Sequence, residues 1–218
     1  MLHFTLFGFP IRIHWLFWLN AALLGGAFSA RTPSEMQGVA VWIAMVFLSI
    51  LIHELGHALV MRRFGERRAE IILYAFGGLA IGSAWRTRRE QILISAAGPL
   101  AQLLPGFIIW SQFAPSYDLI QLLHGNGLHQ FAGVSIFWGA LNLLPIIPMD
   151  GGRISEAAFG PAKERLALTI SLVCAVALAL YMGISQGQLF AALFFGMLAY
   201  NNWQRLNRAE QLPWMNVH

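Results

Sequence analysis

Long apolar runs, separated by short polar stretches, dominate this chain of 218 residues. Each of six runs is close to the roughly 20 residues that a helix needs to cross a bilayer. They cover about 13–30, 39–61, 91–112, 127–148, 166–184 and 187–203. The pattern predicts an all-α polytopic membrane protein with about six transmembrane helices. Because no polar stretch is long enough for a soluble domain, residues 1–218 are expected to form one membrane-embedded domain.

The segment 69–84 departs from this pattern, since it is too short to cross a bilayer and too apolar for a solvated loop. Residues Ile71, Ile72, Tyr74 and Phe76 favour a strand, and the glycine pair at 77–78 indicates a turn or a close approach of the backbone. We expect a small re-entrant β-hairpin that enters the bilayer from the cytoplasmic side, where protein or a water-filled cavity satisfies its backbone. An interfacial amphipathic helix is the alternative.

Composition and charge strengthen the membrane assignment. Only 11% of residues are charged and 57% are hydrophobic, whereas soluble domains are roughly one-quarter charged. All of the 14 Lys and Arg residues except Arg12 and Arg31 fall within 62–89, 153–165 and 205–208. By the positive-inside rule these segments and both termini are cytoplasmic. Because the charges flank apolar runs, their expected partner is the headgroup layer of the lipid bilayer and not nucleic acid.

Two further features bear on the cellular setting. Residues 1–10 lack the basic region and the small-residue cleavage site of a removable signal peptide. The single cysteine, Cys174, lies in the middle of an apolar run and is interpreted as a small buried residue. We therefore expect an integral protein of a prokaryotic cell membrane.

The motif His53-Glu54-Leu55-Gly56-His57 lies within the second apolar run. Two histidines four residues apart share one helix face and can bind one tetrahedral zinc ion, while Glu54 can reach a water molecule in the open position. Ionisable groups at this depth are costly without a partner, and a metal ion is a suitable one. His53 is nine residues before Arg62, about 13 Å along a helix, so the site should lie below the cytoplasmic surface.

A third protein ligand must come from elsewhere in the chain. Asp150 is the best candidate, because Pro145 and Pro148 interrupt the end of the fourth apolar run and let a carboxylate turn inward. The other carboxylates lie in polar loops or tails, where solvated pairing is the default. His14 is the next candidate, although its place at the start of the first run is more typical of an interfacial residue.

Together these motifs resemble the site-2 protease family of intramembrane zinc metalloproteases. Four segments recur in the order of the family: the HELGH motif, Tyr74-Ala75-Phe76-Gly77-Gly78, Ala97-Gly98-Pro99, and the stretch Asn142…Pro145…Pro148-Met149-Asp150-Gly151-Gly152. Two positions differ from the family pattern, with Gln102 where Asn is common and Met149 where Leu is common. We expect a near-minimal form of the family, without a PDZ or CBS domain.

The resemblance implies specific roles. It implies that His53, His57 and Asp150 bind one Zn²⁺ and that Glu54 is the catalytic base. It also implies that Asn142 lies near the scissile peptide and that residues 71–80 form the edge that receives substrate. The candidate substrate-binding residues of that edge are Leu73, Ala75, Gly77 and Gly78.

The expected function is therefore cleavage of a transmembrane segment of a substrate protein near its cytoplasmic end. The alternative is a metal-binding membrane protein without protease activity, either a transporter or an inactive relative that binds substrates. A transporter would be expected to have paired broken helices in two halves, and an inactive relative would be expected to have lost Glu54.

Overall fold

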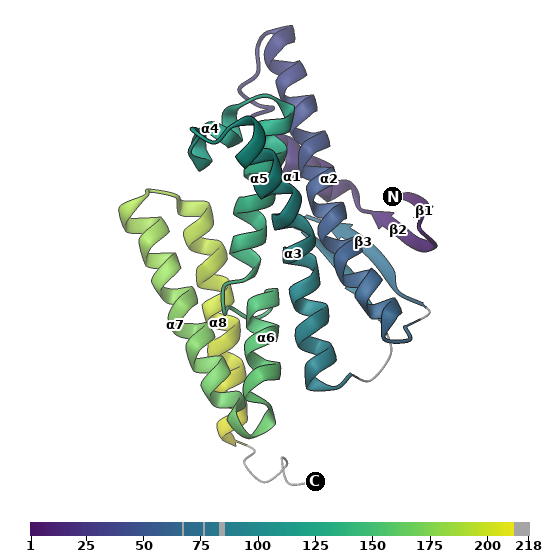
Figure 1. The fold of residues 1–218 in the computed structure, drawn as a ribbon. Helices are drawn as coiled ribbons and strands as arrows, with labels where there is room; N and C mark the ends of the chain where they lie inside the picture. The colour runs from purple at the N-terminus through teal and green to yellow at the C-terminus, as the bar shows by residue number, and fades with distance from the viewer. Residues whose placement is uncertain (67, 76, 83–85, 212–218) are drawn as a thin grey trace. The chain divides into compact units, whose positions relative to one another are not determined.

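The computed structural model describes residues 1–66, 68–75, 77–82 and 86–211, and Figure 1 shows it as a ribbon. Phe76, which the sequence favours as part of a strand, and the basic residue Arg67 lie outside the described residues. The described chain is mostly helical, with one small mixed sheet. Contacts divide the chain into two compact units, residues 1–85 with 97–141 and residues 86–96 with 142–218.

The first unit contains a four-stranded sheet in the order β1-β2-β3-β4. The strands are β1 (Leu2–Leu6), β2 (Phe9–Ile13), β3 (Glu70–Tyr74) and β4 (Gly77–Ile81). Strands β2 and β3 are parallel, and the other two pairs are antiparallel. The hairpin predicted between the second and third apolar runs is confirmed as β3–β4, so the helical alternative is wrong. Because β1 and β2 join it, the fold is not all-α.

The turn of this hairpin comes before the glycine pair at 77–78. Tyr74 pairs with Gly77 across the hairpin, so Ala75 is in the turn, while Gly77 and Gly78 belong to β4. The glycine pair therefore does not form the turn. It allows a close approach of the backbone, which was the other predicted role, because a Cβ atom at Gly78 would overlap the side chain of Glu54.

The first hairpin, β1–β2, turns tightly at Phe7 and Gly8, which have φ values of 50° and 81°. Two successive positive φ values are typical of the tight turns that match the twist of a hairpin. Arg62 fastens this turn, because its Nη1 donates to the Phe7 carbonyl at 2.7 Å and its guanidinium lies 4.5 Å from the Phe9 ring centroid. The N-terminal hairpin therefore lies beside the basic end of the helix that carries Arg62.

That helix is α2 (Pro33–Arg63), which has 31 residues. It begins six residues before the predicted run, because Thr32 and Glu35 form a capping box and Pro33 occupies the first turn. The preceding helix, α1 (Trp15–Leu24), has only 10 residues, or about 15 Å of length. The predicted span 13–30 was too long, because β2 extends to Ile13 and two glycines follow Leu24.

Three more helices follow the sheet. Helix α3 (Arg88–Phe113) contains Pro99 and Pro105 and connects the two units, α4 (Leu119–His124) is short, and α5 (Gly127–Asn142) ends three residues before Pro145. The predicted span 127–148 was therefore six residues too long, since the residue before a proline is disfavoured in the helical region. The irregular stretch after α5 leads to Asp150.

The second unit contains the C-terminal helices. They are α6 (Asp150–Phe159), the short η1 (Pro161–Lys163), α7 (Glu164–Leu180), the wide turn η2 (Tyr181–Ser185) and α8 (Leu189–Gln211). Near the end of α8, Nη2 of Arg205 lies 2.6 Å from Oε1 of Glu156 and 3.4 Å from Oε1 of Glu164. The end of α8 therefore lies beside α6 and the start of α7.

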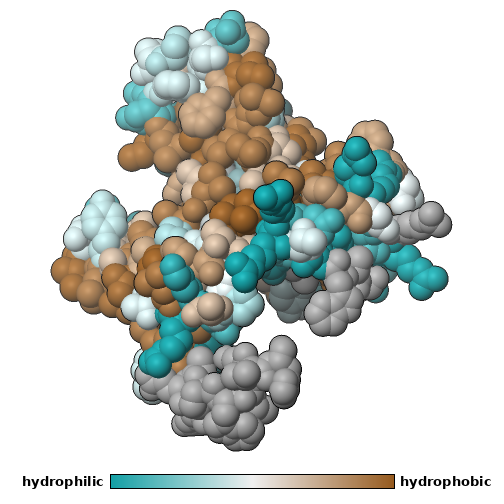
Figure 2. Space-filling model, turned by 60° about the horizontal axis from the view of Figure 1, so that its bottom comes forward, coloured by the Kyte–Doolittle hydropathy of each residue, from teal (hydrophilic) through white to brown (hydrophobic). Residues whose placement is uncertain are grey.

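Three of the described helical segments are long and apolar enough to cross a membrane: Pro33–Arg63, Arg88–Phe113 and Pro161–Ser185. A further apolar helix, Trp15–Leu24, is shorter. Many large apolar side chains are exposed, and Figure 2 shows hydrophobic surface over much of the face in view, with hydrophilic residues in separate groups. These observations define an integral membrane protein and confirm three of the six predicted spans by length and composition.

Candidate metal centre

Helix α2 brings the two histidines of the HELGH motif together. His53 and His57 are both buried, and their Nε2 atoms lie 3.1 Å apart. Two nitrogens that each lie about 2.0–2.1 Å from one tetrahedral zinc ion would be about 3.3 Å apart. The spacing of the two imidazoles therefore fits a shared ion.

The other ring nitrogen of His53 is also occupied. Its Nδ1 lies 2.9 Å from Oε1 of Gln102, a fully buried residue of α3. An amide oxygen can only accept, so Nδ1 carries the proton and Nε2 presents a lone pair. This is the tautomer that a metal ligand requires.

Asp150 belongs to the second unit, where it is the first residue of α6 and is buried. The turn before it is held by two helices, because the Ile147 N–H donates to Ser171 Oγ and Asn202 Nδ2 donates to the Ile147 carbonyl, both at 2.8 Å. The two glycines that follow Asp150 are buried residues of α6. A Cβ atom at Gly151 would overlap the Leu143 carbonyl, so the glycines let α6 start close against the preceding turn.

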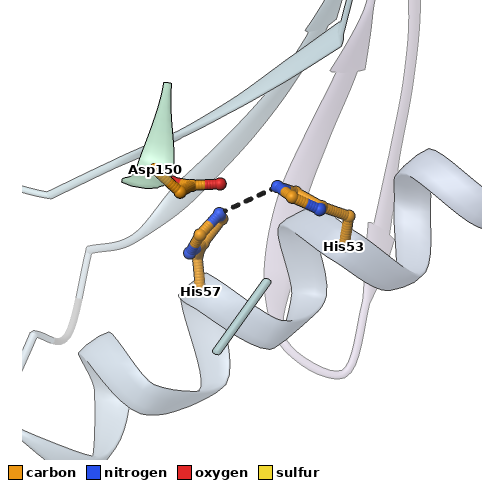
Figure 3. Close-up of side chains that lie close together, drawn as sticks. All are labelled: His53, His57 and Asp150. Atoms are coloured by element: carbon orange, nitrogen blue, oxygen red, sulfur yellow. Dashed lines mark hydrogen bonds between the residues drawn. The ribbon is translucent and has the colours of Figure 1, made fainter. Parts of the chain in front are cut away.

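The structure groups His53, His57 and Asp150. One ligand atom from each of these buried residues lies within 4.8 Å of the others, and Figure 3 shows the imidazoles and the carboxylate pointing toward one another. Two imidazoles and one carboxylate are a donor set that zinc accepts, with a fourth position left for water or substrate. The residues predicted as metal ligands therefore form a chemically suitable site.

Glu54 follows His53 on α2 and is 3% exposed. Strand β4 covers it closely, since Gly78 leaves no room for a Cβ atom beside the Glu54 carboxyl group. Gly98 of α3 is in a similar position, because a Cβ atom there would overlap Nε2 of His57. The glycines of two motifs are thus explained by close contact with the Glu54 carboxyl group and with Nε2 of His57.

The other predicted site residues lie in different settings. Leu73 is fully buried in the central strand β3, where it pairs with Ile13 on one side and Gly78 on the other, so it does not lie at an edge. Ala75 is half-buried in the turn, and Asn142 is the half-buried last residue of α5.

His14 is not part of the metal group. Its Nδ1 accepts the N–H of Leu16 at the start of α1, and its ring centroid lies 4.8 Å from that of Tyr74. Sequence reasoning missed the role of Gln102. A glutamine inside an apolar run, which needs a polar partner at that depth, was the signal that could have revealed it.

The fold and this group of residues define a membrane-embedded protein of the HExxH metal-binding class. Comparison with known proteins makes the assignment specific. The model of Peptidase family M50 matches residues 41–121. The solved structure of the site-2 protease from Methanocaldococcus jannaschii aligns with a TM-score of 0.65 and 26% identity, over 94% of each chain. The chain belongs to the site-2 protease family, peptidase family M50.

Two curated relatives extend the comparison. A zinc metalloprotease of Methanocaldococcus jannaschii is 31% identical over 204 residues, which cover 91% of this chain and 54% of that protein. Stage IV sporulation protein FB of Bacillus subtilis is 29% identical over 197 residues, which cover 84% of this chain and 63% of that protein. This chain therefore spans between half and two-thirds of the length of these two relatives.

Proposed function

We propose that this chain is an intramembrane zinc metalloprotease that cuts a transmembrane segment of another protein near its cytoplasmic end. The observation that carries this proposal is the buried group of His53, His57 and Asp150, with Glu54 next to the first ligand. In the proposal the three residues bind one zinc ion and the whole chain works as a single membrane-embedded protease domain. The test is cleavage of a single-span protein by the wild type and by the Glu54→Gln variant.

The chemistry is hydrolysis of a peptide bond. Zinc, when bound, supplies a Lewis acid that makes a water molecule more acidic and polarises the peptide carbonyl. Glu54 takes the proton from the water and then gives it to the nitrogen of the departing amine. Asn142, at the end of α5, donates from its side-chain amide to the developing oxyanion or to the substrate backbone.

The alternative is a metal-binding membrane protein without protease activity. The position of Glu54 favours an enzyme, because a general base must lie close to the water that it activates, and Glu54 follows the metal-binding residue His53 on α2. The wild type and the Glu54→Gln variant would behave alike if the alternative held, since neither would cleave the substrate.

The substrate would reach the site as an unwound strand. Helical peptide bonds are hidden within their own hydrogen bonds, and addition to the edge of a sheet is a common way to bind an extended segment. In the described part of the chain β4 is an outer strand, it packs against α2, and its Gly78 touches Glu54. We therefore place the receiving edge on β4, with Gly77 and Gly78, and not on the central β3 that holds Leu73.

Proline variants of β4 test this edge. Successive N–H groups of a strand point to opposite sides, so Ala80→Pro and Ile81→Pro remove one N–H that faces β3 and one that faces outward. We expect the outward-facing variant to reduce cleavage strongly while bound zinc is retained. Ile81→Val keeps the N–H and is the control. Normal cleavage by both proline variants would contradict the edge proposal.

The proposed topology places both termini in the cytoplasm and has six membrane-crossing segments. In each unit, an arginine from the basic segments contacts the chain near a segment that the charge pattern assigns to the cytoplasm. Arg62 joins the N-terminal hairpin to the basic end of α2 in the first unit, and Arg205 joins the end of α8 to α6 and α7 in the second. The protein would thus be an integral component of a prokaryotic cell membrane, with a transmembrane protein as substrate and the lipid bilayer as surroundings.

Reporter fusions measure this topology directly. Ser116 lies before α4 in a segment without basic residues, and Lys163 lies in the basic segment before α7. We expect a reporter that is active only outside the cytoplasm to work when fused at Ser116. A reporter that is active only in the cytoplasm should work when fused at Lys163. The same side for both fusions would contradict the proposed topology.

A further inference from the structure

A chain of buried hydrogen bonds leads away from the metal-binding residue His53 through three helices. His53 Nδ1 lies 2.9 Å from Gln102 Oε1, Gln102 Nε2 lies 2.8 Å from Ser49 Oγ, and Ser49 Oγ lies 2.8 Å from Ser135 Oγ. The residues belong to α2, α3 and α5, all in the first unit. Gln102 and the two serines have no exposed surface, so water does not compete for these bonds.

The chemistry of each side chain determines which atom donates in each of these hydrogen bonds. With its amide nitrogen donating to Ser49, Gln102 has its oxygen toward His53, and that oxygen accepts from Nδ1–H. Ser49 Oγ accepts from Gln102 Nε2, and the Ser49 hydroxyl is free to donate a hydrogen bond to Ser135 Oγ. Every link is satisfied when Nδ1 of His53 is protonated. A proton on Nε2 instead would leave the amide oxygen facing a lone pair.

The position of the proton on His53 matters because the other ring nitrogen, Nε2, is the one that faces the metal site. A histidine that binds a metal through Nε2 must keep its proton on Nδ1, and a partner at Nδ1 fixes both the tautomer and the angle of the ring. The Nε2 atom of His53 is the one that faces Nε2 of His57 at 3.1 Å. Gln102 therefore contacts the edge of the imidazole ring that carries Nδ1, whereas Nε2 on the other edge faces the metal site.

We propose that Gln102 is a positioning residue that holds His53 in its zinc-binding tautomer and orientation, with Ser49 and Ser135 fixing the direction of its amide. This inference rests on the proposed zinc site, but it concerns metal affinity and not cleavage. This role accounts for the buried amide. For stability alone, an apolar side chain of similar size would be at least as favourable at this depth.

Three variants separate positioning from packing. Gln102→Leu keeps the approximate volume and removes the acceptor at Nδ1, while Gln102→Glu keeps an acceptor for Nδ1. Gln91→Leu is the matched control, because Gln91 also lies on α3, eleven residues before Gln102, and donates to a serine, Ser95, at 3.1 Å. Zinc affinity is measured by competition with a chelator in detergent, and the absorption spectrum of the cobalt-substituted protein reports the ligand geometry.

We expect Gln102→Leu to weaken zinc binding by about 10–100-fold and to alter the cobalt spectrum, as is typical when the outer partner of a metal-binding histidine is lost. Gln102→Glu should restore most of the affinity, and Gln91→Leu should bind zinc like the wild type. Unchanged affinity in Gln102→Leu would overturn the proposal. An equal loss in Gln102→Leu and Gln102→Glu, accompanied by equal falls in melting temperature, would also overturn it. If the wild type binds zinc but cleaves no substrate, the proposed function fails while this inference stands.

Discussion

Replacing Glu54 by glutamine is expected to lower the rate of cleavage of a transmembrane substrate by about 10²–10⁴-fold, the usual contribution of a general acid–base group. The amide has nearly the same shape as the carboxylate but cannot take a proton from water. Because Glu54 is not one of the grouped metal-binding residues, zinc should remain. Co-expression with a single-span substrate measures cleavage, and atomic spectrometry of the purified protein measures zinc.

A matched pair of glycine variants checks the position of Glu54. Gly78→Ala introduces a methyl group that overlaps the Glu54 side chain, whereas a Cβ atom at Gly38, on the same helix as Glu54, meets no other atom within 4 Å. We expect cleavage to fall in the first variant and to persist in the second, with zinc retained in both. Turnover at the wild-type rate in Glu54→Gln would refute the assignment of the base.

Replacing Asp150 by alanine is expected to remove most of the bound zinc. Two imidazoles would remain, and water would have to take the place of the lost carboxylate. The fall in affinity should exceed the roughly 10–100-fold that is typical of losing an outer partner of a ligand. Zinc content after purification and affinity by chelator competition both measure this effect.

Glu156→Ala provides the control for Asp150→Ala. Glu156 is another carboxylate of α6, it pairs with Arg205 at the surface, and it is not part of the metal group. Exposed ion pairs contribute only about 0.2–1 kcal/mol, so this variant should fold and bind zinc normally. Full zinc occupancy in Asp150→Ala would mean that a different residue completes the site.

The sequence predicted the helices well and the small sheet only in part. Apolar runs of about 20 residues are a strong signal, and each of the six overlaps a helix. The strands of residues 2–13 gave a weak signal, because five-residue strands show few cycles of alternation and β2 pairs with β3, which lies more than 55 residues further along the chain. The first helix was predicted too long at both ends, because the apolar strand β2 hid its start by two residues and the glycines after Leu24 end it six residues early.

The metal-binding group was predictable because its parts carry local signals. The spacing of His53 and His57 places them on one helix face, and the prolines around Asp150 interrupt a helix beside a carboxylate. The glutamine in an apolar run and the glycine pair were signals of a polar partner and of a close approach, but the partners of Gln102, Gly78 and Gly98 could not be assigned in this way. Their roles depend on which side chains of α2 they face, and helix pairing is set by packing and not by spacing within one segment.

The two bonds that hold Ile147 have a consequence for the order in which the protein matures. Ser171 and Asn202 are synthesised 24 and 55 residues after Ile147, on the last two helices, α7 and α8. During synthesis the histidines of α2 are complete long before the turn that presents Asp150 is fastened. We therefore expect the nascent chain to enter the membrane without a finished zinc site. On the proposed function, cleavage would begin only after α8 has packed against the turn at Ile147.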